Sequence, residues 1–297
     1  MEIPFEPTSY NPDNEVLRQA ADAVGNFTVS LLVFPTKSSV PPGRGAIQPL
    51  ACATGVLLEV GVRQFILTAG HAVDIAVSNV LIIPSSQTSM VVNVGLDVGW
   101  SAHGGDGIAD WGVLEVHQKE RILGRRHSFP SLRRLGPIPE KSKLLLYGMP
   151  DSMAVRTVDS VQMRALWTHG AVAGRGSAPA RTRPTPDIES VELWLPTSRA
   201  SSDFSDEFLM GPMGGLSGGG VWSFNVAEDG LSWDPTSLRL VATHSGSFSD
   251  VELFEEKPVR RTIATGIRHH IEAIIQRYPA LKTELRYFDG ENGWPTR

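Results

Sequence analysis

The chain has 297 residues, of which 41% are hydrophobic and 20% are charged, and its formal net charge is −5. These proportions are typical of a globular protein with a substantial hydrophobic core. The slightly acidic balance and the lack of a long basic run give no support to binding of nucleic acid or of a membrane surface.

The amino terminus and the cysteine content bear on the compartment. Residues 1–15 contain neither the basic nor the apolar segment of a secretory signal. No apolar run approaches the ~20 residues that cross a bilayer. The single cysteine, Cys52, excludes an internal disulfide bond, so nothing favours an oxidising compartment. We therefore expect a cytoplasmic protein in which Cys52 is a small buried hydrophobic side chain.

Short β-branched runs dominate most of the chain, which is typical of an all-β sandwich or barrel. The first series of predicted strands covers 27–34, 53–60, 63–69, 79–84, 91–98 and 111–116. The second series covers 143–149, 161–167, 190–196, 220–226 and 238–245. Between the two series, the charged residues 117–141 contain prolines and predict a connection between two lobes. Residues 170–187, rich in Gly, Ala, Pro and Arg, predict a surface loop.

Only the end of the chain predicts a clear helix. Four isoleucines recur there on one face: Ile267, Ile271, Ile274 and Ile275. Their spacing favours an amphipathic helix, which Pro279 would end. The predicted organisation is an N-terminal extension, a first β-lobe, a linker, a second β-lobe, and a C-terminal helix with its tail: 1–24, 25–117, 118–141, 142–265 and 266–297.

Residues 211–224, GPMGGLSGGGVWSF, crowd glycines around Ser217. A flexible linker is disfavoured, because large apolar residues that need burial follow at once. The spacing G-x-S-x-G also occurs in the nucleophile elbow of α/β-hydrolases, but that elbow needs a helix after the serine. Here the residues after Ser217 predict a strand, which excludes that elbow. The glycines instead suit a tight turn that points backbone N–H groups at an oxyanion.

A serine nucleophile needs an imidazole base and a buried carboxylate that holds the imidazole. His71 follows an apolar predicted strand in FILTAGHAVD, and Asp110 precedes another in DWGVLEV. Asp106, in the glycine-rich HGGDG segment, is an alternative carboxylate, although such a loop usually holds a turn aspartate. An ordinary core histidine is the alternative for His71, and a turn serine is the alternative for Ser217.

Taken in order, FILTAGH, DWGVLEV, GLSGGG and LRLVATHSGS resemble the trypsin-like (chymotrypsin-fold) serine peptidases, specifically the disulfide-free bacterial type, over residues 25–275. The resemblance implies two six-stranded β-barrels with the active site between them. It implies peptide-bond hydrolysis through an acyl-enzyme, with His71, Asp110 and Ser217 as the triad and no cofactor. The amides of Gly215 and Ser217 would form the oxyanion hole.

The resemblance also implies where a substrate side chain would bind. The substrate-binding residues that it indicates are Gly211, His244, Ser245 and Gly246. Because the pocket floor falls at Gly211, the aspartate that selects Arg or Lys substrates is absent. His244 resembles the histidine with which bacterial glutamyl endopeptidases contact an acidic side chain, and Arg260 and Arg261 could add positive charge at the rim. A structural His244, with a pocket for small or apolar side chains, is the alternative.

Leu216 stands where secreted members of the family carry an aspartate that pairs with a newly freed amino terminus, so activation by amino-terminal trimming is not expected. Bacterial intracellular relatives are often encoded beside defence systems and act on a dedicated partner protein. The resemblance therefore implies a protein or peptide substrate and a regulatory or activating partner. A non-catalytic relative that binds peptides in the cleft is the competing hypothesis, and the intact triad counts against it.

The other histidines are His103, His117, His127, His169, His244, His269 and His270, and most of them are expected on the surface or in linkers. The sequence holds neither an HExxH motif nor a Cys/His cluster, so we expect no metal site.

Overall fold

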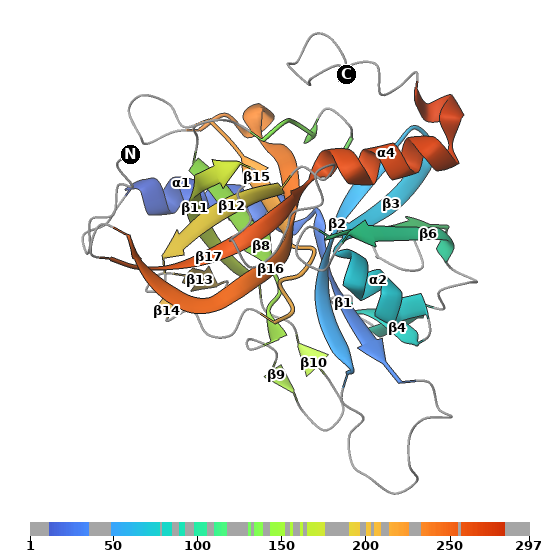
Figure 1. Ribbon diagram of the computed structural model, residues 1–297, viewed down its shortest axis with the longest axis horizontal. Helices are drawn as coiled ribbons and strands as arrows, with labels where there is room; N and C mark the ends of the chain where they lie inside the picture. Colours follow the sequence, from blue (N-terminus) through green and yellow to red (C-terminus); the bar gives the residue numbers. More distant parts are fainter. Residues whose placement is uncertain are drawn as a thin grey trace, which may run out of the picture.

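The computed structural model describes residues 12–35, 49–77, 79–84, 89–92, 98–105, 110–117, 130–131, 134–138, 143–151, 155–156, 161–162, 165–175, 190–196, 200–202, 205–208, 214–225, 233–254 and 257–282. Most of the regular structure in these ranges is antiparallel β-strand, with few helices (Figure 1). None of the described helices is long and apolar enough to cross a membrane.

The first sheet has seven strands in the order β5-β4-β1-β2-β3-β7-β6, with every neighbouring pair antiparallel. Its strands are β1 (Thr28–Phe34), β2 (Ala51–Val60), β3 (Arg63–Thr68), β4 (Val80–Pro84), β5 (Ser89–Val92), β6 (Val98–Gly105) and β7 (Asp110–Val116). Helix α2 (Gly70–Val77) follows β3 and buries Ala72, Val73 and Ala76 in a hydrophobic cluster with residues of this sheet.

The second sheet has eight strands in the order β12-β17-β16-β15-β8-β11-β13-β14, and β12 also pairs with β11. Its strands are β8 (Lys143–Gly148), β11 (Leu166–Arg175), β12 (Ser190–Pro196), β13 (Ala200–Ser202), β14 (Ser205–Phe208), β15 (Gly220–Ser223), β16 (Arg239–Phe254) and β17 (Lys257–Gly266). The short strands β9 (Val155–Arg156) and β10 (Val161–Gln162) pair with each other only.

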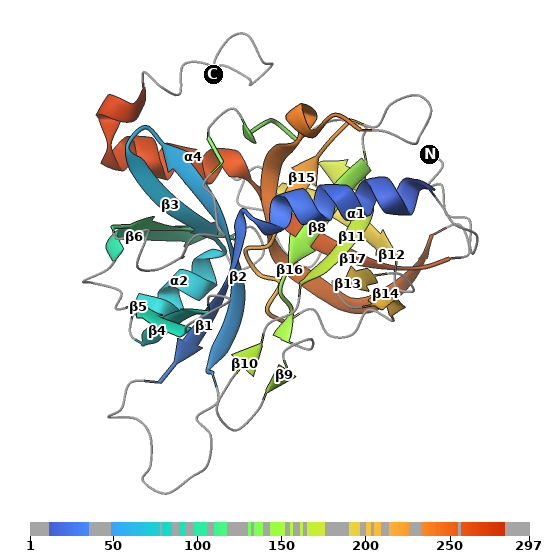
Figure 2. The same ribbon diagram turned by 180° about the vertical axis from the view of Figure 1, so that it is seen from behind.

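Two helices complete the core. Helix α1 (Pro12–Gly25) lies against β8 (Figure 2), and α4 (Ile267–Arg277) packs against β7. One hydrophobic cluster contains buried residues of both helices and of both sheets, among them Val24, Phe65, Trp222 and Ile274. Burying such side chains contributes about 1.5–3 kcal/mol each, which joins the two sheets into one core.

The strand pattern confirms a mostly antiparallel β structure, whereas two six-stranded barrels are not confirmed. Among the described strands the first sheet stays open, since its edge strands β5 and β6 do not pair with each other. The predicted helix exists as α4, and Pro279 follows it at the start of a 3₁₀ turn. The division of the chain into five segments stays a prediction.

Two expectations about local structure need correction. Residues 170–175, predicted as the start of a surface loop, belong to β11, because this strand pairs with β8 as far as Ala171 and with β12 from Ala171 to Arg175, whatever its composition. Cys52, predicted as a buried hydrophobic side chain, is partly exposed, and its Sγ lies 3.1 Å from Asp151 Oδ1 as a hydrogen-bond donor.

Candidate active site

Strand pairing brings His71 to Asp110. His71 is the second residue of α2, which begins just after β3 ends, and Asp110 is the first residue of β7. Strands β3 and β7 pair antiparallel with Thr68 opposite Gly112, so the end of one meets the start of the other. At Gly70 a Cβ would lie 2.7 Å from Trp111 O, so only glycine lets α2 start this close to β7.

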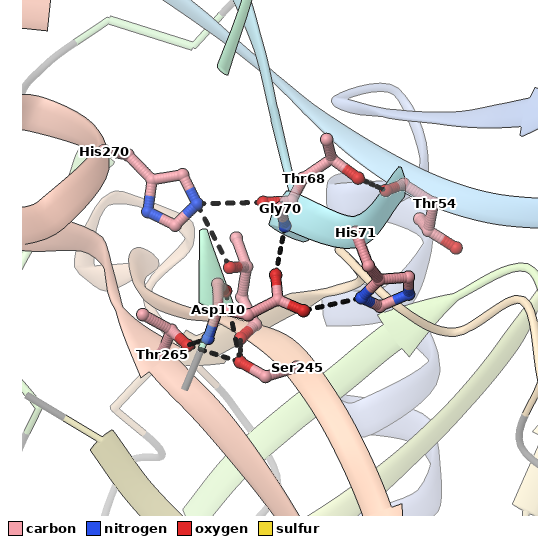
Figure 3. Close-up of polar contacts among 9 residues, drawn as sticks. Thr54, Thr68, Gly70, His71, Asp110, Ser245, Thr265 and His270 are labelled. Atoms are coloured by element: carbon pink, nitrogen blue, oxygen red, sulfur yellow. Dashed lines mark hydrogen bonds and ion pairs between the residues drawn. The ribbon is translucent and has the colours of Figure 1, made fainter. Parts of the chain in front are cut away.

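The His71 ring and the Asp110 carboxylate form a close pair. His71 Nδ1 lies 2.5 Å from Asp110 Oδ2, and Asp110 Oδ1 accepts a hydrogen bond from the Gly70 N–H (Figure 3). The Asp110 side chain is 2% exposed, while that of His71 is 45% exposed. The hydrogen bond to Asp110 raises the pKa of His71 above its ordinary value, although burial opposes the shift. A carboxylate at Nδ1 favours the tautomer that leaves Nε2 free to accept a proton.

Two hydroxyl groups support the backbone of Asp110 (Figure 3). The Asp110 N–H donates to Thr265 Oγ1 at 2.8 Å, and the Ser245 hydroxyl contacts Thr265 Oγ1 and lies 3.4 Å from Asp110 O. Ser245, predicted on the substrate-binding strand, is 2% exposed. Its hydroxyl group therefore supports the carboxylate-bearing strand in this structure. Thr265 has no local sequence signal of its own and was not predicted as a site residue.

His270 of α4 also lies near this pair, and it is buried, unlike the surface or linker position expected for most of the other histidines. Its Nε2 lies 3.1 Å from Thr68 O and 3.3 Å from Thr243 Oγ1, and its ring meets Trp111 edge-on. The residue is fully buried because α4 packs onto β7. Burial lowers the pKa of His270 to about 4, so the ring is neutral at pH 7.

Ser217 lies in a turn whose backbone requires glycine on both sides of the serine. Gly215, two residues before Ser217, has a φ of +89°, and Gly218, directly after Ser217, has a φ of +84°. A Cβ at Gly215 would lie 2.5 Å from Asp151 N, and one at Gly218 would lie 2.1 Å from Thr54 O. Both the left-handed backbone and the close packing therefore require glycine at these positions.

Main-chain hydrogen bonds hold this turn against both sheets. The Gly218 N–H donates to His244 O of β16 at 2.7 Å, and the Thr54 N–H of β2 donates to Ser217 O at 2.8 Å. Leu216 is fully buried, so apolar packing anchors the residue before the serine. Ser217 is partly exposed. Within the described residues no hydrogen bond joins Ser217 Oγ to His71, so the structure pairs two of the three predicted triad residues.

The predicted specificity residues are described only in part. His244 is 2% exposed, with Nε2 lying 3.0 Å from Ser247 Oγ. Burial, and then the charge of His71, lower the pKa of His244 to about 4, so its ring offers a hydrogen bond but no positive charge at pH 7. Gly246 O accepts a hydrogen bond from Thr262 Oγ1 at 2.6 Å. Gly211, the alternative carboxylate Asp106, and the side chains of Arg260 and Arg261 lie outside the described residues.

No group of three or more His, Cys, Asp or Glu side chains that could hold a metal ion occurs in the part of the chain that the structure describes. The candidate site there consists of an imidazole, a carboxylate, hydroxyl groups and backbone amides.

Two solved protease structures are similar to this chain. One is the HtrA-type protease AlgW with tripeptide, at 10% identity and a TM-score of 0.43, covering 87% of this chain and 62% of that chain. The other is the thermostable serine protease AL20 from an extremophilic microorganism, at 11% identity and a TM-score of 0.42, covering 82% of this chain and 91% of that chain. This chain thus spans less than two thirds of the AlgW chain. No protein-family model and no curated protein matches the chain. These likenesses are distant, so a function has to rest on the residues of the chain itself.

Proposed function

We propose that the protein is a serine endopeptidase with His71 as general base, Asp110 as the carboxylate that orients it, and Ser217 as nucleophile. The observation that carries the proposal is the 2.5 Å contact between a half-exposed imidazole and a buried carboxylate. Burying a carboxylate is costly unless it is paired and hydrogen-bonded. Asp110 is both, and the His71 side chain stays 45% exposed, as a proton acceptor requires.

The turn at Ser217 supports the second half of the proposal. In the described part of the chain, neither the Gly215 N–H nor the Ser217 N–H donates a hydrogen bond to another protein group. Two backbone amides on a rigid turn beside a serine hydroxyl suit the oxygen of a tetrahedral intermediate, on which negative charge develops. The Ser217–His71 hydrogen bond would form when substrate binds, because such contacts are often long in a free enzyme.

The reaction would proceed in two steps. Ser217 Oγ attacks the peptide carbonyl carbon while its proton passes to His71 Nε2, and the carbonyl electron pair moves to the oxygen beside the amides. His71 then gives the proton to the leaving amine as the C–N bond breaks, which leaves an acyl-enzyme. Water attacks the acyl-enzyme by the same route and releases Ser217. Asp110 stabilises the imidazolium in both steps.

The substrate would be a protein or peptide. A dedicated partner protein and a role in bacterial defence follow only from the sequence resemblance. The sequence resemblance puts a glycine, Gly211, where the aspartate that selects Arg or Lys would stand, so we propose that cleavage after Arg or Lys is not favoured. The neutral His244 would recognise an acidic side chain through a hydrogen bond, and a pocket for small or apolar side chains is the competing specificity.

A catalytically silent peptide-binding protein is the second candidate. The lack of a hydrogen bond between Ser217 Oγ and His71 within the described residues is the observation that favours it. Labelling with a fluorophosphonate probe separates the two functions, because the probe bonds covalently only to an activated serine.

We expect the probe to label the full chain at Ser217, as mapped by mass spectrometry of the modified peptide. Ser217→Ala should abolish labelling, and His71→Ala should slow it strongly. Ser223→Ala is the matched control, since Ser223 is also partly buried but lies at the end of β15. It should label like the original chain. A folded original chain that takes up no probe would establish the silent alternative.

A further inference from the structure

Thr54 of β2 contacts the Ser217 turn through both its side chain and its main chain. Its Oγ1 donates to Gly215 O at 2.9 Å, and its N–H donates to Ser217 O at 2.8 Å. The same Oγ1 accepts a hydrogen bond from the Met149 N–H at 2.9 Å. Its carbonyl oxygen accepts from Thr68 Oγ1 at 2.7 Å (Figure 3). Thr54 is fully buried, so water does not compete for these contacts.

The neighbouring carbonyl groups of the turn are also held. Gly214 O accepts from the Asp151 N–H, and Leu216 O accepts from the Gly219 N–H, each at 2.7 Å. Together with the two contacts to Thr54, four consecutive carbonyl groups are anchored. Three of the four donors are main-chain N–H groups, and the fourth is the Thr54 hydroxyl. It is the one anchor of the four that a side-chain substitution can remove.

Anchored carbonyl groups determine where the amide N–H groups point. A peptide unit is planar and almost always trans, so its N–H points away from its own C=O. Glycine at 214 and 215 removes the side-chain barriers that would otherwise stop a peptide unit there from rotating. The Gly215 carbonyl shares its peptide unit with the Leu216 N–H, and this unit links the two units that carry the Gly215 and Ser217 N–H groups. Rotation of the linking unit would displace both of these amides, and Thr54 Oγ1 is the partner that holds it.

We propose that Thr54 is a positioning residue for the oxyanion-binding amides, and this proposal rests on the proposed peptidase function. Its hydroxyl group fixes the Gly215–Leu216 peptide unit and, through Met149, the segment whose Asp151 N–H holds Gly214 O. The peptide units on either side of the Gly215 Cα thus both depend on this hydroxyl group, one directly and the other through the segment that begins at Met149. A hydroxyl that donates and accepts at once also strengthens both of its hydrogen bonds.

Removal of this hydroxyl group should affect catalysis more than substrate binding. Thr54→Val keeps the shape of the side chain but leaves Gly215 O and the Met149 N–H buried without this partner, so the peptide unit should turn to find another. The loss of one oxyanion donor typically lowers kcat by about 10²–10³. We expect T54V to lower kcat and the rate of fluorophosphonate labelling by about 10²-fold, with KM changed less than about threefold.

The test compares four variants. T54S keeps the hydroxyl group and should retain labelling within about threefold of the original chain. T54A lacks both the hydroxyl group and the methyl group, so T54S against T54A isolates the hydroxyl group if T54V fails to fold. T28V is the matched control, because Thr28 is also fully buried and its Oγ1 donates to Val24 O at 3.0 Å. Thr28 lies in β1, which carries no proposed site residue. T28V should label like the original chain, with similar thermal stability to T54V.

The outcomes separate this proposal from the function on which it rests. If the original chain is not labelled at Ser217, the peptidase function fails and the role of Thr54 fails with it. If the original chain is labelled and T54V labels at the rate of T28V, only the role of Thr54 is overturned. If T54A labels as fast as T54S, the hydroxyl group is irrelevant and the proposal is wrong.

Discussion

The two halves of the candidate active site are built from different parts of the polypeptide. The half with His71 and Asp110 depends on side chains, a base and a carboxylate that a short hydrogen bond joins. The half with Ser217 depends on main-chain geometry, with left-handed glycines at 215 and 218 and carbonyl groups that neighbouring donors hold. The first half should respond to pH and to changes of charge. The second should respond to changes of shape.

The largest effect should follow loss of the nucleophile. Ser217→Ala should lower turnover of a peptide substrate by about 10⁶-fold, which is the size of the loss in kcat when a catalytic triad loses its serine. Thermal unfolding should change little, because a small, partly exposed hydroxyl group is removed. Retention of more than a few per cent of the original turnover would show that Ser217 is not the nucleophile.

The carboxylate half can be broken without a change of shape. Asp110→Asn should lower turnover by about 10⁴-fold near neutral pH, because an amide at this position favours the wrong tautomer of His71. Asp106→Asn serves as the control and should change turnover by less than about tenfold. Reversed results in steady-state kinetics would assign the orienting carboxylate to Asp106.

The main-chain half can be broken without a change of charge. Gly218→Ala should destabilise the fold by at least about 2 kcal/mol, because an alanine is strained in the left-handed backbone and its Cβ would press against Thr54 O. Gly214→Ala is the matched control, since a Cβ there meets nothing within 4 Å. It should change the free energy of unfolding by less than about 0.5 kcal/mol. Equal losses in urea denaturation would contradict the steric explanation.

The smallest predicted effect is a shift along the pH axis. His71 must be neutral to accept a proton, and the hydrogen bond to Asp110 raises its pKa above the ordinary value. Activity should therefore be lost at low pH, and kcat/KM should rise through an apparent pKa above about 6.5. In the Asp110→Asn variant, the residual activity should still rise with pH, but through an apparent pKa lower than that of the original chain. An unchanged inflection in that variant would show that another group governs the profile.

The same raised pKa predicts the opposite trend for folding. A histidine that binds its proton more tightly in the folded state stabilises the fold fully below the unfolded pKa of about 6.5, and this contribution disappears as pH rises through the folded pKa. Activity and this part of the stability should therefore change in opposite directions over that interval. The half-exposed ring keeps the stability change small.

Motif order predicted that His71 and Asp110 belong together, but not what supports them, and the role of Ser217 stays a prediction. His71 and Asp110 each adjoin an apolar strand, and the antiparallel pairing of β3 with β7 then brings them together. Thr54, Thr265 and His270 occupy ordinary strand or helix positions with no local signal. Their contacts arise only when segments distant in sequence meet, as when Thr265 reaches the Asp110 N–H.

Other parts of the fold were predictable in principle. Helix α1 was missed, although its buried residues recur at helical spacing: Val16, Leu17, Ala20, Ala21 and Val24. The end of β11, residues 170–175, was predicted as loop from its composition, because composition does not show that β8 and then β12 will supply strand partners along this segment. The C-terminal helix was predicted correctly, since its isoleucine face is both local and strongly periodic.

The proposed function requires that the two halves close around one tetrahedral centre, and a crystal structure with a bound peptide boronic acid measures this most directly. We expect the boron atom to be bonded to Ser217 Oγ. One boronate oxygen should lie about 2.7–3.1 Å from the amide nitrogens of both Gly215 and Ser217. His71 should remain hydrogen-bonded to Asp110 while its Nε2 reaches the bound inhibitor. A boronate that leaves Ser217 unmodified, or an oxygen that neither amide contacts, would contradict the proposed function.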